Sequence, residues 1–282
     1  MPIKIITDSL CDLPEPVARE NGITVIPCYV NAGGESFLDG IELSRQEFYR
    51  RLPGYHTPPT TSSPGLGTFI QAYQQAIRQG ATGIISMHVA GKFSNLIDIA
   101  RIAAEEITAA PVTIMDTGQL SLGEGLQVLA AGEAARKGCS LEAITALIAG
   151  MARRTYVFAV LDTLEFLRRS GRASFLQASL GAWLDIKPVM VVHQGEVFME
   201  RLRTRRKAVD RMLERIGALG LLERAALIHS HAPEERMESL RQQARERFHL
   251  NGNLISAEVT PAIGVHVGPA AFGMAVVKAN PA

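Results

Sequence analysis

Short runs of hydroxyl, carboxyl and amide side chains recur in the first half of the chain, and these residue types can bind an anion. The runs are Thr7-Asp8-Ser9, Thr60-Thr61-Ser62-Ser63, Ser94-Asn95 and Asp116-Thr117. Hydroxyl groups donate hydrogen bonds, and free backbone N–H groups at the start of a helix add partial positive charge. Thr61 and Ser94 each stand just upstream of a segment with helical periodicity, as such a site requires. Because Ser, Thr, Asp and Asn are also preferred helix N-caps, capping alone explains each run taken singly.

The elements that must position these runs follow an alternating pattern. Apolar strand-like segments at 3–6, 23–30, 83–87 and 112–115 alternate with helical periodicity at 65–79 and 95–106, and a helix pair fills 122–154. Capping boxes start at Asp12, with Glu15, and at Ser44, with Glu47, whereas residues 53–64 form an irregular polar loop. Alternating strands and helices predict a mostly parallel sheet, whose ligands bind outside the carboxyl ends of the strands.

The pattern changes near residue 156, because strands now follow one another directly. Gln194-Gly195 separates apolar runs at 189–193 and 197–202, which is a hairpin signal. Strands at 225–229, 254–259 and 272–278 and helices at 205–219 and 233–249 complete this half. We therefore predict an α/β protein, with an N-terminal three-layer α/β/α domain over 1–157 and a C-terminal two-layer domain with a mixed sheet over 158–282.

Two further segments carry side chains that could contact a ligand. In the turn-like segment 263–269, His266 stands between Gly264 and Gly268, where backbone and imidazole could approach a bound molecule closely. Gly171 has the place of a helix C-cap, and Arg172 after it could face a phosphate or a carboxylate. A histidine satisfied within its own loop and an exposed arginine without a specific role are the alternative interpretations.

Composition excludes several classes of function. The 29 Lys and Arg residues balance 28 Asp and Glu residues, so the net charge of +1 does not favour nucleic acid or an anionic membrane surface. Cys11, Cys28 and Cys139 are far apart, which argues against a disulfide framework and a zinc site. We expect a cytoplasmic protein without stable membrane insertion, because no stretch approaches about 20 apolar residues and no signal peptide is evident.

Familiar enzyme motifs are absent or incomplete. The chain has no G-x-S-x-G elbow, P-loop or H-E-x-x-H. Gly123-Glu124-Gly125 resembles the start of a dinucleotide loop, but Val128 stands where the third small residue belongs. His229-Ser230-His231 lacks an accompanying carboxylate or cysteine pattern, so we expect no metal and no cofactor. The basic run 201–211 has the character of a solvated face or of a docking surface.

Read in order, these segments resemble the DegV family of bacterial fatty-acid-binding proteins over nearly the whole chain. The motifs that carry the resemblance are collinear: Ile6-Thr7-Asp8-Ser9 with Asp12-Leu13, Asp39-Gly40, Thr61-Ser62-Ser63-Pro64, Ser94, Asp116-Thr117 through Ser121-Leu122-Gly123, Asp162-Thr163-Leu164-Glu165-Phe166-Leu167 with Gly171-Arg172, Lys187-Pro188, and Gly264-Val265-His266-Val267-Gly268-Pro269.

The resemblance implies a long-chain fatty acid, palmitate-like in type, buried between two α/β domains. It implies that Thr61 and Ser94 hold the carboxylate with support from His266, and that Ser62 and Asn95 belong to the same site. Asp8 and Ser9 are expected as supporting residues. Family members present the acyl chain to a soluble kinase that makes acyl phosphate, with the arginine at Arg172 contacting the kinase. The carrier itself then has no catalytic residue and no cofactor.

Some positions depart from the family pattern. Asn95 and Leu96 replace a glycine and a threonine after Ser94, and asparagine tolerates a left-handed conformation better than most residues. Ala270 replaces a glycine, and Gly91-Lys92-Phe93 replaces a small, serine-rich segment before Ser94. We expect these changes to affect the head-group site and the chain-length preference.

Two other functions compete with the carrier. One is a hydrolase or transferase acting on a lipid-like substrate, in which Ser94 or Thr61 is a nucleophile activated by His266 and a carboxylate such as Asp8. The other is a nucleic-acid or regulatory module that uses the basic run 201–211, and the near-neutral charge counts against it.

Overall fold

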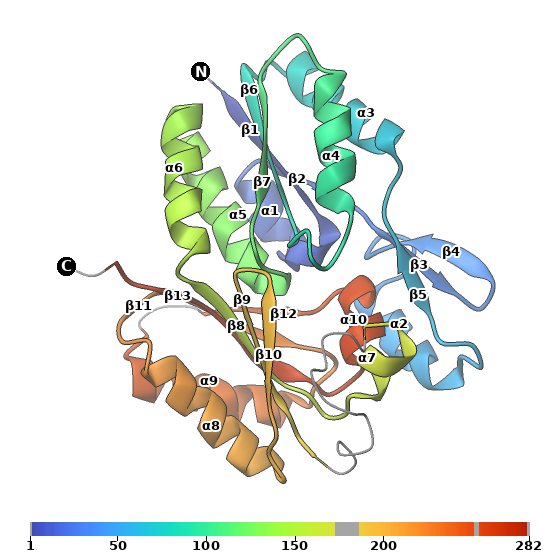
Figure 1. The fold of residues 1–282 in the computed structure, drawn as a ribbon, viewed down its shortest axis with the longest axis vertical. Helices are drawn as coiled ribbons and strands as arrows, with labels where there is room; N and C mark the ends of the chain where they lie inside the picture. The colour runs from blue at the N-terminus through green and yellow to red at the C-terminus, as the bar shows by residue number, and fades with distance from the viewer. Residues whose placement is uncertain (1, 173–185, 251–253, 281–282) are drawn as a thin grey trace.

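The computed structural model describes residues 2–172, 186–250 and 254–280 and contains three sheets (Figure 1). The first sheet is entirely parallel, with the order β2-β1-β6-β7. Its strands are β1 (Ile3–Asp8), β2 (Ile23–Ile26), β6 (Gly83–His88) and β7 (Val112–Asp116). The predicted parallel sheet is therefore confirmed.

Helices cover both faces of the parallel sheet (Figure 1). On one face, α3 (Leu66–Arg78) and α4 (Leu96–Glu105) pack against each other and against the strands. On the other face lie α5 (Ser121–Arg136) and α6 (Leu141–Ala152), and α1 (Glu15–Glu20) packs against β2. All six strand residues of β6 are buried, as expected for a central strand of a covered parallel sheet.

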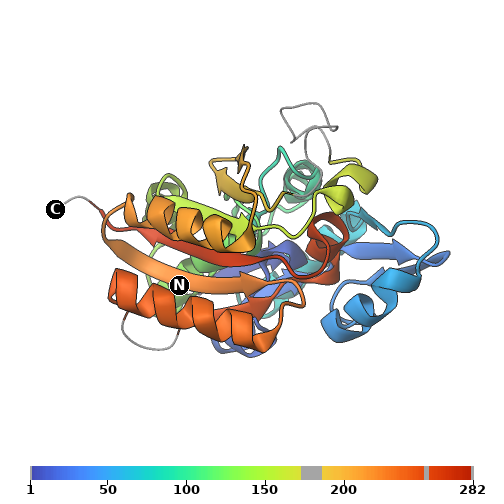
Figure 2. The ribbon, with the colours of Figure 1, turned by 90° about the horizontal axis from the view of Figure 1, so that it is seen from below.

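The second sheet is mixed and has the order β10-β9-β8-β13-β11-β12. Its strands are β8 (Thr155–Val160), β9 (Val189–His193), β10 (Glu196–Glu200), β11 (Leu222–His229), β12 (Ile255–Glu258) and β13 (Phe272–Lys278). The pair α8 (Arg205–Gly217) and α9 (Glu234–Phe248) lies along one face (Figure 2). The mixed sheet is confirmed, whereas the division of the chain at 157/158 stays a prediction.

Side chains of the mixed sheet alternate between two cores, as the strand period of two requires. Phe158 and Val160 belong to the core under α8 and α9. Val157 and Ala159 belong to the larger core that includes α5. The helix α5 therefore contacts strands of both sheets, β1 on one side and β8, β11 and β13 on the other.

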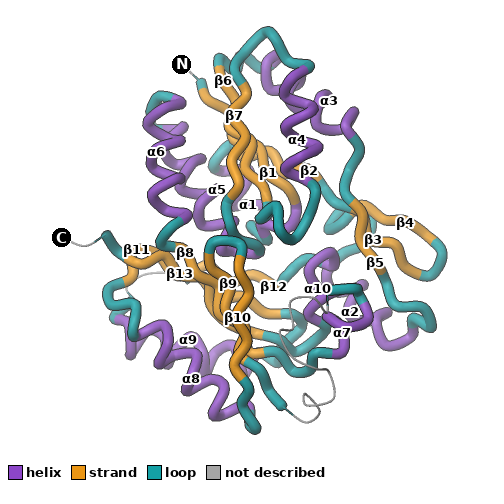
Figure 3. The backbone as a smooth tube through the Cα atoms, viewed as in Figure 1, coloured by secondary structure: helices purple, strands orange, loops and turns teal. Residues whose placement is uncertain are grey.

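A smaller antiparallel sheet and several short helices lie beside the main sheets (Figure 3). Its order is β4-β3-β5, with β3 (Tyr29–Ala32), β4 (Glu35–Leu38) and β5 (Thr60–Ser62). The short helices are α2 (Arg45–Arg51), α7 (Glu165–Arg169), α10 (Pro261–Val267) and the 3₁₀ turns η1 (Ser9–Cys11) and η2 (Leu52–Gly54). β5 and α10 contact each other, as do α10 and α7.

Several local predictions are confirmed at the level of hydrogen bonds. The Ser44 side chain caps α2 by accepting from the Glu47 N–H. Gln194 and Gly195 both have positive φ, as the predicted two-residue hairpin turn needs. The C-terminus of α7 is a Schellman motif, because Gly171 has φ +75° and the Arg172 N–H donates to the Leu167 carbonyl.

Four local predictions are wrong. The strand expected at 23–30 is two strands of different sheets, because Pro27 lies between β2 and β3. The irregular loop 53–64 contains β5. The turn-like segment 263–269 begins with the end of α10, whose first residue is Pro261. Asp12 does not cap α1, which begins after Pro14; it follows η1 with φ +54°.

The helix α5 is buried along most of its length, and its glycines make this close packing possible. A Cβ atom on Gly125 would lie 2.5 Å from the Cys11 carbonyl oxygen, and one on Gly123 would lie 2.5 Å from Val157 Cγ2. The backbone of α5 thus lies directly against η1 on one side and β8 on the other. Larger residues at these positions would push the two sheets away from the helix.

We expect Gly125→Ala to lower the free energy of unfolding by about 1 to 3 kcal/mol, because the new methyl group meets backbone and cannot be accommodated by a rotamer change. Chemical denaturation followed by far-UV circular dichroism measures this. Gly150→Ala in α6 is the matched control, since nothing lies within 4 Å of its Cβ position. The control should gain up to about 1 kcal/mol from helix propensity. Equal stability of the two variants would contradict the packing argument.

Candidate functional site

A cavity of about 530 Å³ lies where the parallel sheet, the mixed sheet and the short helices meet. Its apolar lining comes from Leu10, Cys28, Val89, Phe93, Ile99, Leu120, Leu167, Met190, Val197, Ala262, Ile263 and Val267. Its polar lining comes from Thr61, Ser62, Ser63, Ser94, Asn95, Arg172 and His266. An apolar cavity with a few polar groups is typical of a site for a small amphipathic molecule.

Thr61 and His266 meet at this cavity although 205 positions separate them. Thr61 is held in β5 by its pairing with Val30 of β3, and His266 lies in the last turn of α10. The distance between Thr61 Oγ1 and His266 Nε2 is 3.3 Å, so the hydroxyl and the imidazole share a hydrogen bond. Thr61 and His266 are therefore brought together by the fold, and their joint binding of a ligand stays a prediction.

The imidazole of His266 is neutral at physiological pH. Burial, with a smaller contribution from the nearby Arg172 guanidinium, lowers the pKa of His266 to about 4. Its Nδ1 atom is buried and has no hydrogen-bond partner among the residues that the structure describes. A neutral imidazole has one N–H donor and one acceptor, so it can donate to a ligand without adding a full positive charge.

Ser94 and Asn95 reach the cavity from the N-terminus of α4. Ser94 Oγ accepts a long hydrogen bond of 3.4 Å from the Leu96 N–H. Asn95 Oδ1 accepts a bond of 2.7 Å from Ser63 Oγ, which joins the loop after β5 to the start of α4. Asn95 has φ −85°, so this departure from the family pattern does not require a left-handed conformation. Thr61, Ser62, Ser94 and Asn95 therefore all line one cavity.

Arg172 lines the same cavity from the end of α7. Its Nη2 atom lies 3.5 Å from the Phe93 carbonyl oxygen, and no carboxylate is paired with it among the described residues. The Schellman motif at Gly171 fixes the backbone of Arg172, and so the point from which its side chain extends. Arg172 thus provides positive charge close to His266 and to the segment before Ser94.

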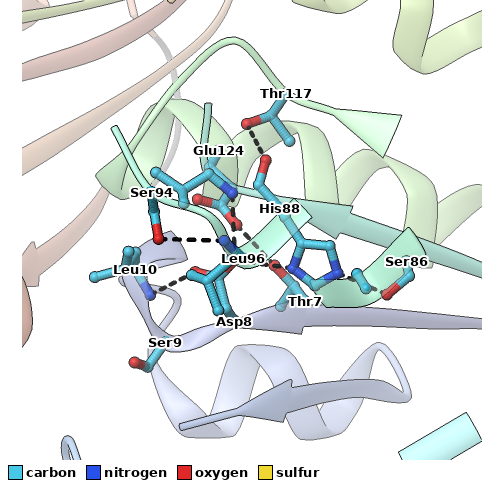
Figure 4. Close-up of polar contacts among 12 residues, drawn as sticks. Thr7, Asp8, Ser9, Leu10, Ser86, His88, Ser94, Leu96, Thr117 and Glu124 are labelled. Atoms are coloured by element: carbon cyan, nitrogen blue, oxygen red, sulfur yellow. Dashed lines mark hydrogen bonds and ion pairs between the residues drawn. The ribbon is translucent and has the colours of Figure 1, made fainter. Parts of the chain in front are cut away.

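Asp8 and Ser9 do not line the cavity but fix the backbone around it. Asp8 Oδ2 accepts from His88 Nδ1 at 2.9 Å and from the Val89 N–H at 3.2 Å, and Asp8 Oδ1 accepts from the Leu10 N–H (Figure 4). Ser9 Oγ donates to Asp39 Oδ2 and accepts from the Cys28 N–H. These hydrogen bonds therefore position Leu10, Cys28 and Val89, which all line the cavity.

Two buried aspartates hold the helix that carries His266, and sequence reasoning missed this role. Asp12 Oδ1 accepts from the Thr260 N–H at 2.7 Å, and Asp39 Oδ1 accepts from the Ala262 N–H at 3.1 Å. Burial raises the pKa of Asp12 to about 7 and that of Asp39 to about 6. The sequence pointed to Asp12 and Asp39 only as members of the motifs that carry the DegV resemblance. Asp12 was wrongly predicted to cap α1.

The geometry disfavours a nucleophile activated by His266. Catalytic triads need a third group to orient the histidine, but His266 Nδ1 has no partner within the described part of the chain. The carboxylate of Asp8, named in that hypothesis, is bound to His88 instead. Within residues 2–172, 186–250 and 254–280, no cluster of His, Cys, Asp and Glu could hold a metal ion.

Comparison with known proteins gives a consistent result. The sequence matches the DegV family, described as uncharacterised proteins, over residues 2–279. The chain belongs to the DegV family. A DegV domain-containing protein of Streptomyces coelicolor is 33% identical over 97% of this chain and 98% of its own. A DegV domain-containing protein of Deinococcus radiodurans is 34% identical over 98% of both chains.

Solved structures of DegV proteins resemble this DegV chain closely. A DegV family protein of Thermus thermophilus, described for its fatty acid binding, has a TM-score of 0.91 at 33% identity, covering 99% of this chain and 100% of that one. DegV of Bacillus subtilis, described as a fatty acid binding protein, has a TM-score of 0.87 at 28% identity with the same coverage. Among the described residues, no helix has the length and apolar composition that crossing a bilayer requires.

The raised pKa values of the buried Asp12 and Asp39 predict how the stability of this DegV protein depends on pH. Unfolded aspartate has a pKa near 3.9, so between pH 4 and about 7 the folded state holds protons that the unfolded chain releases. The contribution of Asp12 and Asp39 is therefore full below pH 4 and is lost as pH rises toward 7. The steepest loss is about 1.4 kcal/mol per pH unit for each group.

Urea denaturation at pH 4.5 to 7.5 tests this prediction on the wild type and on Asp12→Asn. The asparagine oxygen still accepts from the Thr260 N–H but does not titrate, so the decrease of stability with pH should be shallower. Asp98→Asn is the control, because Asp98 is exposed and forms a surface ion pair with Arg101. Identical slopes for Asp12→Asn and the wild type would refute the assignment.

Proposed function

We propose that this protein binds a long-chain fatty acid in the 530 Å³ cavity, with its carboxylate at Thr61, Ser94 and His266. The observation that carries the proposal is the contact between Thr61 and His266 in a cavity whose lining is mostly apolar. Ser62 and Asn95 also contribute to the polar lining. In this proposal the ligand lies between an N-terminal domain, 1–157, and a C-terminal domain, 158–282. The fatty acid binding described for the Thermus thermophilus and Bacillus subtilis proteins supports the proposal.

The proposed binding is energetically reasonable. Each buried methylene contributes about 0.8 kcal/mol, so an acyl chain of about sixteen carbons can provide high affinity without strong contacts to its head. The hydroxyls and the neutral imidazole donate hydrogen bonds without full charge, which leaves the carboxylate nucleophilic. A bidentate arginine clamp would stabilise the carboxylate more and make it less reactive.

We propose further that the protein presents the bound carboxylate to a soluble kinase, which supplies ATP and forms acyl phosphate. In this scheme the chain is a carrier without turnover of its own. Arg172 lines the cavity beside His266, and no carboxylate is paired with it among the described residues. A guanidinium whose one described hydrogen bond is a long one to the Phe93 carbonyl suits a contact with the kinase or with the phosphate as it is transferred.

Removal of the head-group donors should weaken fatty acid binding. Thr61→Val and Ser94→Ala each lose a hydrogen bond to a charged group, worth about 1.5 to 3 kcal/mol, so the Kd for palmitate should rise roughly tenfold to hundredfold. Displacement of a fluorescent fatty acid from delipidated protein measures the Kd. Lipid extraction and mass spectrometry of the purified wild type should also find a bound fatty acid.

Thr24→Val is the matched control, because Thr24 is an exposed strand residue that does not line this cavity. Its Kd should stay within about twofold of the wild-type value. Absence of saturable binding of C12 to C20 fatty acids by the delipidated wild type would refute the proposed function.

Arg172→Ala should uncouple binding from phosphorylation. At saturating palmitate, with a purified soluble bacterial fatty acid kinase and ATP, we expect the rate of acyl-phosphate formation, trapped as hydroxamate, to fall at least tenfold. Arg169→Ala is the control, because Arg169 is exposed and pairs with Glu165 on α7. Equal rates for the two variants would remove Arg172 from the proposed kinase contact.

A further inference from the structure

A second, smaller cavity of about 30 Å³ adjoins the first. The two cavities share four lining residues: Leu120, Met190, Ile263 and Val267. The remaining walls of the second cavity are Ser121, Val157, Ala159, Leu161, Ile228, His229, Ser230, Val259, Ala271 and Phe272. Four side chains therefore separate two spaces that would otherwise be one.

The second cavity lies between the mixed sheet and the segment that begins α5. Val157 and Ala159 of β8 and Ile228 of β11 contribute side chains from the face of the sheet that packs against α5. None of Thr61, Ser94 or His266 lines this cavity. A fatty acid whose carboxylate is bound by these three residues would therefore have only its chain available to enter the second cavity.

The four separating side chains differ in how easily they can move. Leu120, the N-cap residue of α5, is branched at Cγ and has two rotatable side-chain bonds. Ile263 and Val267 are β-branched residues of α10, so their χ1 angles are restricted by the helix. Met190 of β9 is an unbranched thioether with three rotatable bonds, the type of side chain that most readily adapts to an irregular space. Met190 is buried opposite Ala159 of β8, whose small side chain leaves room beside it.

We propose that the second cavity receives the terminal carbons of a long, unbranched acyl chain, and that Met190 is the gate that sets the longest chain bound without penalty. This inference rests on the proposed fatty acid binding, and it names the part of the acyl chain whose length the protein selects. The second cavity is only large enough for about one water molecule. Terminal methylenes can enter only if Met190 changes rotamer, so chains that extend beyond the first cavity bind with less gain per carbon.

The chain-length dependence of binding tests the gate. The Kd of delipidated protein is measured for saturated C12, C14, C16, C18 and C20 acids by displacement of a fluorescent fatty acid. In the wild type each added methylene should tighten binding roughly fourfold until the first cavity is filled, and less thereafter. Met190→Ala opens the passage, so the ratio of the C16 Kd to the C20 Kd should rise at least fourfold above the wild-type ratio.

A second variant changes the cavity in the opposite direction. Ala159→Val narrows the second cavity with a residue that suits a strand, so the C16 to C20 ratio should fall while the C12 Kd stays within about twofold. Met199→Ala is the matched control, because Met199 of β10 pairs directly with Met190 but lines neither cavity. Its ratio should equal that of the wild type.

The outcomes separate this inference from the proposed function. If the wild type binds fatty acids but Met190→Ala and Ala159→Val both leave the C16 to C20 ratio within twofold of the wild type, the gate is refuted and the carrier function stands. If Met199→Ala shifts the ratio as much as Met190→Ala, loosened packing of the hairpin explains the effect and the gate is likewise refuted. If the wild type binds none of the acids, the proposed function itself fails.

Discussion

The burial of α5 between two sheets is the constraint on which the rest of the structure depends. A helix with a polar face could not lie there, and α5 is accordingly buried on nearly all sides, with glycines where η1 and β8 approach its backbone. Its one deeply buried acid, Glu124, accepts a hydrogen bond from Thr7, and burial raises its pKa well above the ordinary value. This shared helix sets the separation of the two sheets.

The position of His266 follows from a second buried arrangement, next to the N-terminus of α5. Asp12 and Asp39 accept from backbone N–H groups at the start of α10, and they are themselves bound by Ser121 and Ser9. Burying two carboxylates costs free energy, which their raised pKa values reflect. The cost is offset by hydrogen bonds that fix a seven-residue helix too short to be stable alone.

Local patterns predicted the regular elements well and the junctions poorly. Periodicity located α3, α4 and the strands of both main sheets except β8, because each of these elements has a sustained apolar pattern. It missed β5, whose three polar residues are ordered by pairing with β3, and it missed α10, which is held by Asp12 and Asp39 from far along the chain. The pairing of Thr61 with His266 was available only through family resemblance, because no local signal joins residues 205 positions apart.

Under the proposed function, the reactivity of the bound carboxylate depends on how much positive charge surrounds it. Arg172 and burial together keep His266 neutral, so the groups nearest Thr61 donate hydrogen bonds without adding a second full charge. If His266 were charged as well, the carboxylate would be bound as a tight ion pair and would be a poorer nucleophile. Under the proposed function, a site with one guanidinium, one neutral imidazole and several hydroxyls would bind the head group weakly and the acyl chain strongly. In this proposal the acyl chain provides most of the affinity, and the carboxylate provides the reactivity.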